Sequence, residues 1–203
     1  MGRIPKASSY WRKTFIISKL DKYIERYGLK IVSIKKVDLR DTYLQYLHNS
    51  KLDDLLTVDG SIDRSMLNSP HFELAHLYYD HGKKWLMKHY KDTKYFQFKN
   101  NVLNRTDIVP LKKIGVFDSI RDGYPKKGHE KDYVVLLNEP LIHTRFNVKH
   151  IPLNSLEVFI GHHRIAALLA LGINEVKVII AEDIKKGTCD IYGKLSDNYR
   201  KAL

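Results

Sequence analysis

Residues 158–183 read VFIGHHRIAALLALGINEVKVIIAED. A short apolar run ends at Gly161, leucines and alanines with helical spacing follow, and Gly172 precedes a second apolar run rich in β-branched residues. This order predicts a strand, a helix that ends at a glycine, and a second strand. The tetrapeptide Gly-His-His-Arg therefore lies on the turn that leads into the helix.

This turn combines features that suit an anion. The first N–H groups of a helix have no intrahelical acceptor and lie at the positive end of the helix dipole. Gly161 lets an anion approach the main chain closely, and Arg164 can hold two oxygens of one phosphate. His162 and His163 can donate a hydrogen bond or exchange a proton near neutral pH. The turn alone is equally compatible with a purely structural glycine and solvated histidines.

Composition indicates a folded protein with anionic partners. The 203 residues are 43% hydrophobic, and 35 Lys and Arg against 23 Asp and Glu give a net charge of +12. Such a charge favours nucleic acid, nucleotides or phosphosugars, although it also suits an ordinary basic surface. Cys189 is the single cysteine, and the N-terminal segment has no long apolar run. We therefore expect a cytoplasmic protein that does not cross a membrane.

The hydrophobic pattern predicts an α+β fold in two regions and a tail. We expect a mainly helical region with one or two strands over 1–105, a small mixed sheet with helices over 106–185, and a tail over 186–203. Expected helices lie at 11–27, 41–56 (broken), 70–90 (with a break at Gly82), 116–124 and 162–171; expected strands lie at 30–39, 107–114, 132–137, 156–160 and 176–183; and a turn is expected at 58–63.

Two segments together resemble the ParB/sulfiredoxin-like superfamily. The strand, GHHR turn, alanine-rich helix, Leu-Gly and closing strand of 156–183 match its Gly-x-x-Arg signature. Upstream, VPLKKI at 109–114 and FDSIRDGYP at 117–125 resemble its first strand and its S-I-x-x-G-x-x-P helix. The resemblance covers about residues 106–183, less than half of the chain.

The resemblance implies a nucleotide site at the turn. In this superfamily the turn binds phosphates of nucleoside di- or triphosphates, so Gly161, His162, His163 and Arg164 are expected to bind ATP or CTP with Mg²⁺. Sulfiredoxins have a catalytic Cys where this chain has His162, so sulfinic acid reduction is not expected. Partition proteins continue into a helix-turn-helix domain, whereas 20 residues follow Asp183 here. A sliding DNA clamp is therefore not expected either.

Further candidate residues lie near the ends of predicted elements. Our first choice for a catalytic carboxylate is Glu139, just after a predicted strand, while His162 and His163 are the candidate acid–base or hydrogen-bonding residues. Additional candidates for phosphate binding are Ser119, Arg121 and Arg145, and alternative carboxylates are Asp118 and Glu157.

Other patterns are weaker as sites. His71, His76 and His81 are five residues apart, which turns a helix by about 140° beyond a full turn, so they do not share one metal-binding face. HExxH, CxxC and Walker A spacings are absent from the sequence. Aromatic residues among lysines between 78 and 98 suit either a core or base stacking, and helical spacing favours the core.

These observations favour an enzyme that handles phosphoryl groups, by kinase-like transfer or by hydrolysis of a nucleoside polyphosphate. The alternative is a DNA-binding module or ParB-like nuclease that grips backbone phosphate. In either case we expect the region 1–105 to pack against the C-terminal module and shape its pocket.

Overall fold

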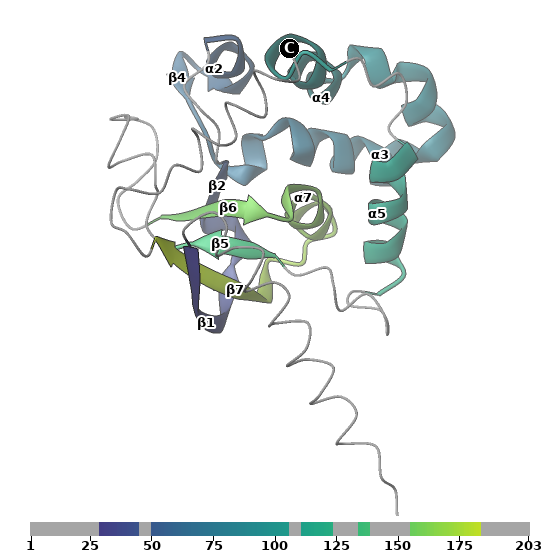
Figure 1. The fold of residues 1–203 in the computed structure, drawn as a ribbon. Coiled ribbons are helices and arrows are strands. Elements are labelled where there is room, and N and C mark those ends of the chain that lie inside the picture. The colour runs from purple at the N-terminus through teal and green to yellow at the C-terminus, as the bar shows by residue number, and fades with distance from the viewer. Residues whose placement is uncertain (1–28, 45–49, 106–110, 124–133, 139–154, 184–203) are drawn as a thin grey trace, which may run out of the picture.

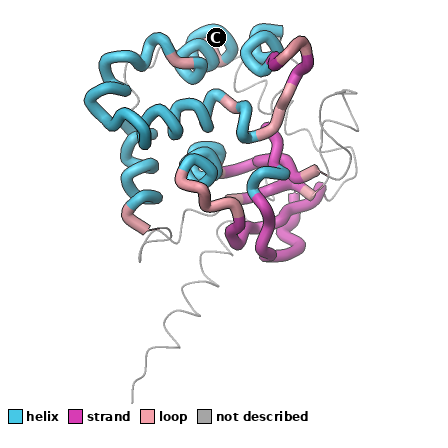
Figure 2. The backbone as a smooth tube through the Cα atoms, turned by 180° about the vertical axis from the view of Figure 1, so that it is seen from behind, coloured by secondary structure: helices cyan, strands magenta, loops and turns pink. Residues whose placement is uncertain are grey.

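The computed structural model describes residues 29–44, 50–105, 111–123, 134–138 and 155–183. Within them the fold is α+β, as predicted, with a five-stranded mixed sheet covered by helices (Figures 1 and 2). The sheet contains β1 (Leu29–Asp38), β2 (Thr42–Leu44), β5 (Val135–Leu137), β6 (Leu156–Ile160) and β7 (Glu175–Asp183). The helices are α2 (Ser50–Leu56), α3 (Pro70–His89), α4 (Lys94–Gln97), α5 (Leu111–Arg121) and α7 (His162–Ala170).

The strand order of the large sheet is β1-β7-β5-β6-β2. β1 pairs with β7 and β5 pairs with β6 in antiparallel fashion, whereas β5 with β7 and β2 with β6 are parallel. β6 and β7 are joined through α7, so the strand–helix–strand order predicted for 156–183 is confirmed. Because α7 begins directly after β6, its first turn lies at the end of that strand, beside β5.

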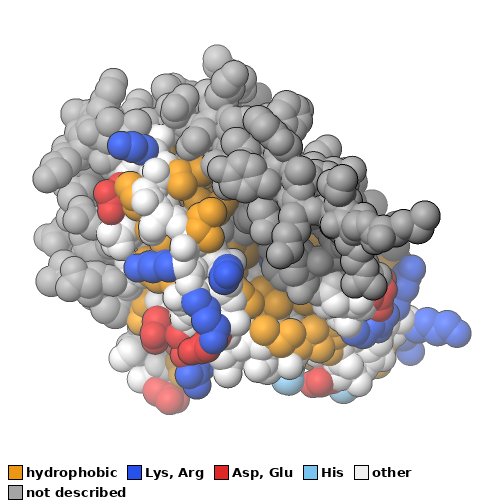
Figure 3. Space-filling view, turned by 90° about the horizontal axis from the view of Figure 1, so that it is seen from below, with side chains coloured by type: hydrophobic (Ala, Val, Ile, Leu, Met, Phe, Trp, Pro, Cys, Tyr) orange, Lys and Arg blue, Asp and Glu red, His pale blue; other side chains and the backbone are white. Residues whose placement is uncertain are grey.

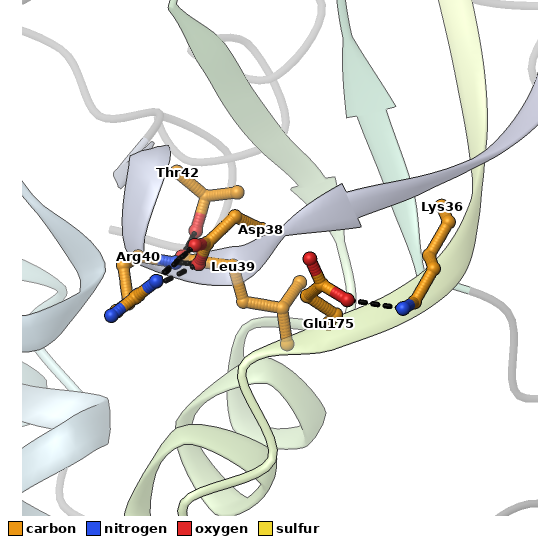
Figure 4. A network of polar contacts seen from close by, with 6 residues as sticks. All are labelled: Lys36, Asp38, Leu39, Arg40, Thr42 and Glu175. Atoms are coloured by element: carbon orange, nitrogen blue, oxygen red, sulfur yellow. Dashed lines mark hydrogen bonds and ion pairs between the residues drawn. The ribbon is translucent and has the colours of Figure 1, made fainter.

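The turn after β1 is held by its own side chains (Figure 4). Asp38 accepts hydrogen bonds from the backbone N–H of Arg40 at 2.9 Å and from its Nε at 3.0 Å, and these bonds lower the pKa of Asp38 to about 2. Thr42 Oγ1 donates to the carbonyl of Leu39 at 2.5 Å. This hydrogen bond closes a single 3₁₀ turn, η1 (Leu39–Asp41), which is followed directly by β2.

β2 corrects one of the predictions. A broken helix is expected over 41–56, but residues 42–44 form a strand parallel to β6, and the described helix begins only at Ser50. Thr42 and Leu44 are buried on either side of half-exposed Tyr43, which is the alternation of a strand. Three residues are too few for that alternation to be distinguished from a helix in the sequence.

The long helix α3 follows its predicted boundaries. Ser69 Oγ accepts a hydrogen bond from the N–H of Phe72 at 3.0 Å, and Pro70 occupies the first helical position. Gly82 interrupts the helix with φ 80° and ψ 174°, which confirms the predicted break. The turn at 58–63 is also confirmed, as Asp59 and Gly60 take positive φ between the short strands β3 (Thr57–Val58) and β4 (Ser61–Ile62).

The segment before α5 corrects a second prediction. A strand is expected over 107–114, but α5 already begins at Leu111, and Lys113 and Ile114 lie in its first turn. The apolar residues Ile114, Phe117 and Ile120 are all buried and are three residues apart, so they form one helical stripe. In the sequence, Ile108 and Val109 precede Leu111 and Ile114, and this apolar run resembles a strand.

One hydrophobic core includes residues from both sides of position 105. Leu74 and Leu86 of α3 belong to the same buried cluster as Leu136, Val158 and Ile165. β1 and β2 likewise complete the sheet formed by β5, β6 and β7. The division into two regions at residue 105 stays a prediction, but within the described chain the two parts share a sheet and a core.

Candidate functional site

The turn between β6 and α7 requires glycine. Gly161 has φ 105° and ψ 20°, in the left-handed region that L-residues avoid. A Cβ at this position would lie 3.1 Å from Val134 Cγ2 and 3.3 Å from Val134 Cα. The Gly161 carbonyl accepts hydrogen bonds from the N–H groups of Arg164 and Ile165 at 2.9 and 3.0 Å, which starts the helix. Gly161 therefore fixes the direction of the first turn of α7.

A pocket of about 310 Å³ lies over this first turn. Gly161, His162, His163 and Arg164 line it together with Lys113 and Val116 from α5. We call it the α7 pocket. The four residues predicted from the sequence thus line one cavity, and α5 adds a second cation. Its described lining contains two cationic side chains and no carboxylate.

A third histidine supports the two histidines of the turn. His71, at the start of α3, is 2% exposed. Its ring stacks on His162 with 5.2 Å between centroids and meets His163 edge to face at 4.8 Å. These three residues form the histidine cluster. α3 also packs along α7, so a helix from the region 1–105 contacts the predicted site through His71.

His163 is fixed by a buried tyrosine. Tyr95 of α4 is 2% exposed, and its Oη lies 2.7 Å from His163 Nε2. Phe98 and Tyr95 also contact His71 at centroid distances of 5.4 and 5.2 Å. Because Nε2 of His163 is engaged by the tyrosine, Nδ1 is its second ring nitrogen for further hydrogen bonding.

The histidine cluster is held neutral. Burial lowers the pKa of His162 from 6.5 to about 4. Burial also lowers the pKa of His71 and of His163 well below 6.5, and the positive charges of Lys113 and Lys99 add to the effect on both. Arg164 acts on the pKa of His163 in the same direction. The electrostatic environment of the cluster is therefore cationic.

The neutral histidines make stability dependent on pH. Their folded pKa values lie below the unfolded value near 6.5, so the unfolded state binds more protons on acidification. For His162 this contribution is complete above pH 6.5 and is lost between 6.5 and about 4, at up to about 1.4 kcal/mol per pH unit, and the lowered pKa values of His71 and His163 act in the same direction. We expect urea midpoints to fall from pH 7.5 to 5.5.

The variant His71→Leu should show a flatter pH dependence of the urea midpoint than the unmodified protein. His76→Gln is the control, because His76 is exposed and pairs with Asp80 at 3.3 Å, away from the cluster. Equal midpoints at pH 7.5 and 5.5 in the unmodified protein would contradict the neutral state of the cluster.

The remaining predicted residues lie elsewhere. Arg121 is exposed, pairs with Asp118 at 2.7 Å and lies 6.0 Å from the centre of the Tyr78 ring. Asp118 also accepts a hydrogen bond from Tyr78, so it joins α5 to α3. Ser119 is half-buried on α5, and neither it nor Arg121 is among the residues that line the α7 pocket.

The other two carboxylate candidates lie in the core and in an undescribed segment. Glu157 is fully buried in β6, at 0% exposure. Glu139 and Arg145 lie outside the described residues. The expected helix 11–27 and the tail 186–203 also lie outside them.

Sequence reasoning missed three residues that shape the site. The sequence indicates His71 only by its histidine spacing and Tyr95 only as a core aromatic, and it places Lys113 in a predicted strand. Tyr78, Tyr90, Tyr95 and Phe98 are indeed buried, so the core interpretation of these aromatics is confirmed. A helical phase for 111–121 would have placed Lys113 and Val116 on one face, three residues apart.

Neither a metal cluster nor a membrane-spanning helix is found in the described part of the chain. Among the described residues, no group of three or more His, Cys, Asp or Glu side chains is arranged to hold a metal ion. None of the described helices is both long and apolar enough to span a bilayer.

Comparison with known proteins gives no relative from which a role could be transferred. No family model matches the chain, and neither the curated proteins nor the solved structures contain a match.

Proposed function

We propose that the α7 pocket binds the terminal phosphates of a nucleoside polyphosphate and that the protein is an enzyme that handles phosphoryl groups. The observation that carries the proposal is the convergence of Lys113, Arg164 and the first turn of α7 on one cavity. Main-chain N–H groups at a helix start and a guanidinium are the partners that phosphate oxygens prefer.

The charges around His163 support an anionic occupant. Among the described residues, the positive charges of Lys113, Lys99 and Arg164 lower the pKa of His163, as does His162. A phosphate in the pocket would lie close to these positive charges. The electrostatic attraction for an anion is therefore stronger here than beside an isolated lysine on the surface.

The histidines act as neutral hydrogen-bonding groups in this proposal. A neutral imidazole donates through one nitrogen and accepts through the other. If Tyr95 donates to Nε2 of His163, the proton of that imidazole resides on Nδ1, which can then donate to a phosphate oxygen. This assignment differs from the proton exchange near pH 7 that the sequence suggests, because burial lowers the pKa of both His162 and His163.

The pocket suits the phosphates better than it suits a metal ion directly. Mg²⁺ prefers oxygen ligands, and the described lining offers nitrogen cations and imidazoles. Magnesium would thus arrive with the nucleotide, and Glu139 remains the sequence candidate for a nearby carboxylate. Positioning and charge stabilisation, which phosphoryl transfer needs most, are what the described residues can supply.

The resemblance to the ParB/sulfiredoxin-like superfamily is part of the proposal. It assigns phosphate binding to Gly161, His162, His163 and Arg164, and these are four of the six described residues around the pocket. Transfer to an acceptor and hydrolysis are both compatible with this lining.

Thermal shift experiments with ATP, CTP, ADP and short duplex DNA, each with and without Mg²⁺, test the proposal. A ligand at about 100 times its dissociation constant adds about 2.7 kcal/mol to the free energy of unfolding. We expect a nucleotide to raise the melting temperature by about 5–10 °C. Stabilisation by DNA and not by any nucleotide would favour the alternative, a DNA-binding module or nuclease.

A further inference from the structure

A column of three rings lies on α3 at and after its break at Gly82. Trp85 lies between His81 and His89, with ring centroids 4.3 Å apart in both pairs and interplanar angles of 33° and 24°. His81 is exposed and the other two are half-buried. His89 Nδ1 lies 2.9 Å from the Trp85 carbonyl, which anchors one end. We call these three residues the ring column; Trp85 and His89 are one turn apart, and His81 meets Trp85 across the break at Gly82.

Lysines run beside the ring column. Beyond the break at Gly82, Lys88 is three residues after Trp85 and four after Lys84, so it is a surface neighbour of that ring and of Lys84. Lys91 continues the row in the next turn, and all three are exposed. The acidic residues nearest to this row in the sequence are Asp80, which pairs with His76, and Asp92, which follows Lys91.

This face is separate from the α7 pocket. His71 in the first half of α3 contacts α7, whereas the helix changes direction at Gly82 (Figures 1 and 2). Figure 3 shows that basic side chains also lie on another face of the molecule, intermixed there with apolar and acidic ones. Side-by-side rows of rings and lysines are the distinguishing feature of α3.

We propose that this face of α3 binds single-stranded nucleic acid. Lys84, Lys88 and Lys91 would contact successive phosphates, and an unpaired base would stack on the exposed ring of His81. Sequence-tolerant single-strand sites combine these two elements, a basic track and aromatic platforms. A duplex is a poorer occupant because its bases stack on each other and leave no face for the imidazole. The proposal goes beyond the phosphate pocket and does not depend on it.

The test is fluorescence anisotropy with labelled oligothymidylate and oligouridylate of about 12 nucleotides, a length in the range of known single-strand sites. Each phosphate neutralised contributes about 0.7 to the slope of log affinity against log salt, so three lysines predict a slope of about −2. The double variant Lys84→Glu/Lys88→Glu should lower affinity at least about tenfold and reduce the slope by about 1.4. Comparing the two oligonucleotides tells whether DNA or RNA is preferred.

Two controls make the result specific. Lys30→Glu/Lys35→Glu alters the net charge equally at exposed positions of β1 and should change affinity much less. His81→Ala should weaken binding about tenfold and leave the salt slope unchanged, because stacking releases no counterions. Equal losses in the two double variants, or duplex DNA that binds as tightly as a single strand, would overturn the proposal. Circular dichroism of each variant verifies that α3 is intact.

Discussion

Replacing Gly161 by alanine should cost about 2–4 kcal/mol of stability and abolish anion binding. The left-handed φ of 105° alone costs an L-residue about 1–2 kcal/mol. The added Cβ also meets Val134 Cγ2 at 3.1 Å and its Cα at 3.3 Å, and the backbone of β5 cannot move without disturbing the sheet. For a chain of this size we expect the melting temperature to fall by about 10 °C, measured by calorimetry.

Two other glycines serve as matched controls for Gly161→Ala. Gly60 also has a positive φ, 77°, but a Cβ there meets nothing within 4 Å, so Gly60→Ala measures backbone strain alone, about 1 kcal/mol. Gly115 lies inside α5 with open space around it, and Gly115→Ala should stabilise by about 0.5–1 kcal/mol. If Gly161→Ala costs no more than Gly60→Ala, the close contact with Val134 is not structurally significant.

Replacing Arg164 by alanine should weaken binding of a nucleoside triphosphate or pyrophosphate by about 30-fold, with little change in stability. Charge-assisted hydrogen bonds to phosphate are worth about 2 kcal/mol. The residue is half-buried at the first turn of α7 and lines the pocket, so its removal leaves the backbone turn in place. Isothermal titration calorimetry on the unmodified protein and the variant measures the difference in Kd.

Lys113→Ala should weaken the same ligand by a smaller factor, about tenfold, because an ammonium contributes charge without a bidentate contact. Lys177→Ala on β7 is the control, since Lys177 is exposed on the sheet and is not part of the pocket lining. If the affinities of Arg164→Ala and Lys177→Ala are equal, Arg164 has no specific role.

The elements of the C-terminal half were largely predictable because each has a strong local signal. The apolar run 156–160, the leucine and alanine spacing of α7 and the two flanking glycines specify a strand, a helix and their limits. Ser69 and Pro70 do the same for α3. The short strand β2 could not be predicted from local sequence, because its conformation depends on pairing with β6, over 100 residues away.

The site was predictable only where its residues are adjacent in sequence. Residues 161–164 form one turn, so a local pattern could identify them. Lys113, His71 and Tyr95 reach the same place from three other helices, and their positions follow from the packing of α3, α4 and α5 on α7. Lowered histidine pKa values also arise from burial that only the tertiary fold creates.

The central claim is that the first turn of α7 and the side chains around it receive phosphate. Titration of the ¹⁵N-labelled protein with pyrophosphate, followed by amide chemical shifts, tests this claim at the level of single residues. The account predicts that the largest shifts fall on the amides of Gly161, His162, His163 and Arg164, with Lys113 next. Shifts confined to other surfaces, such as the lysines of α3, or no saturable shifts at all, would contradict it.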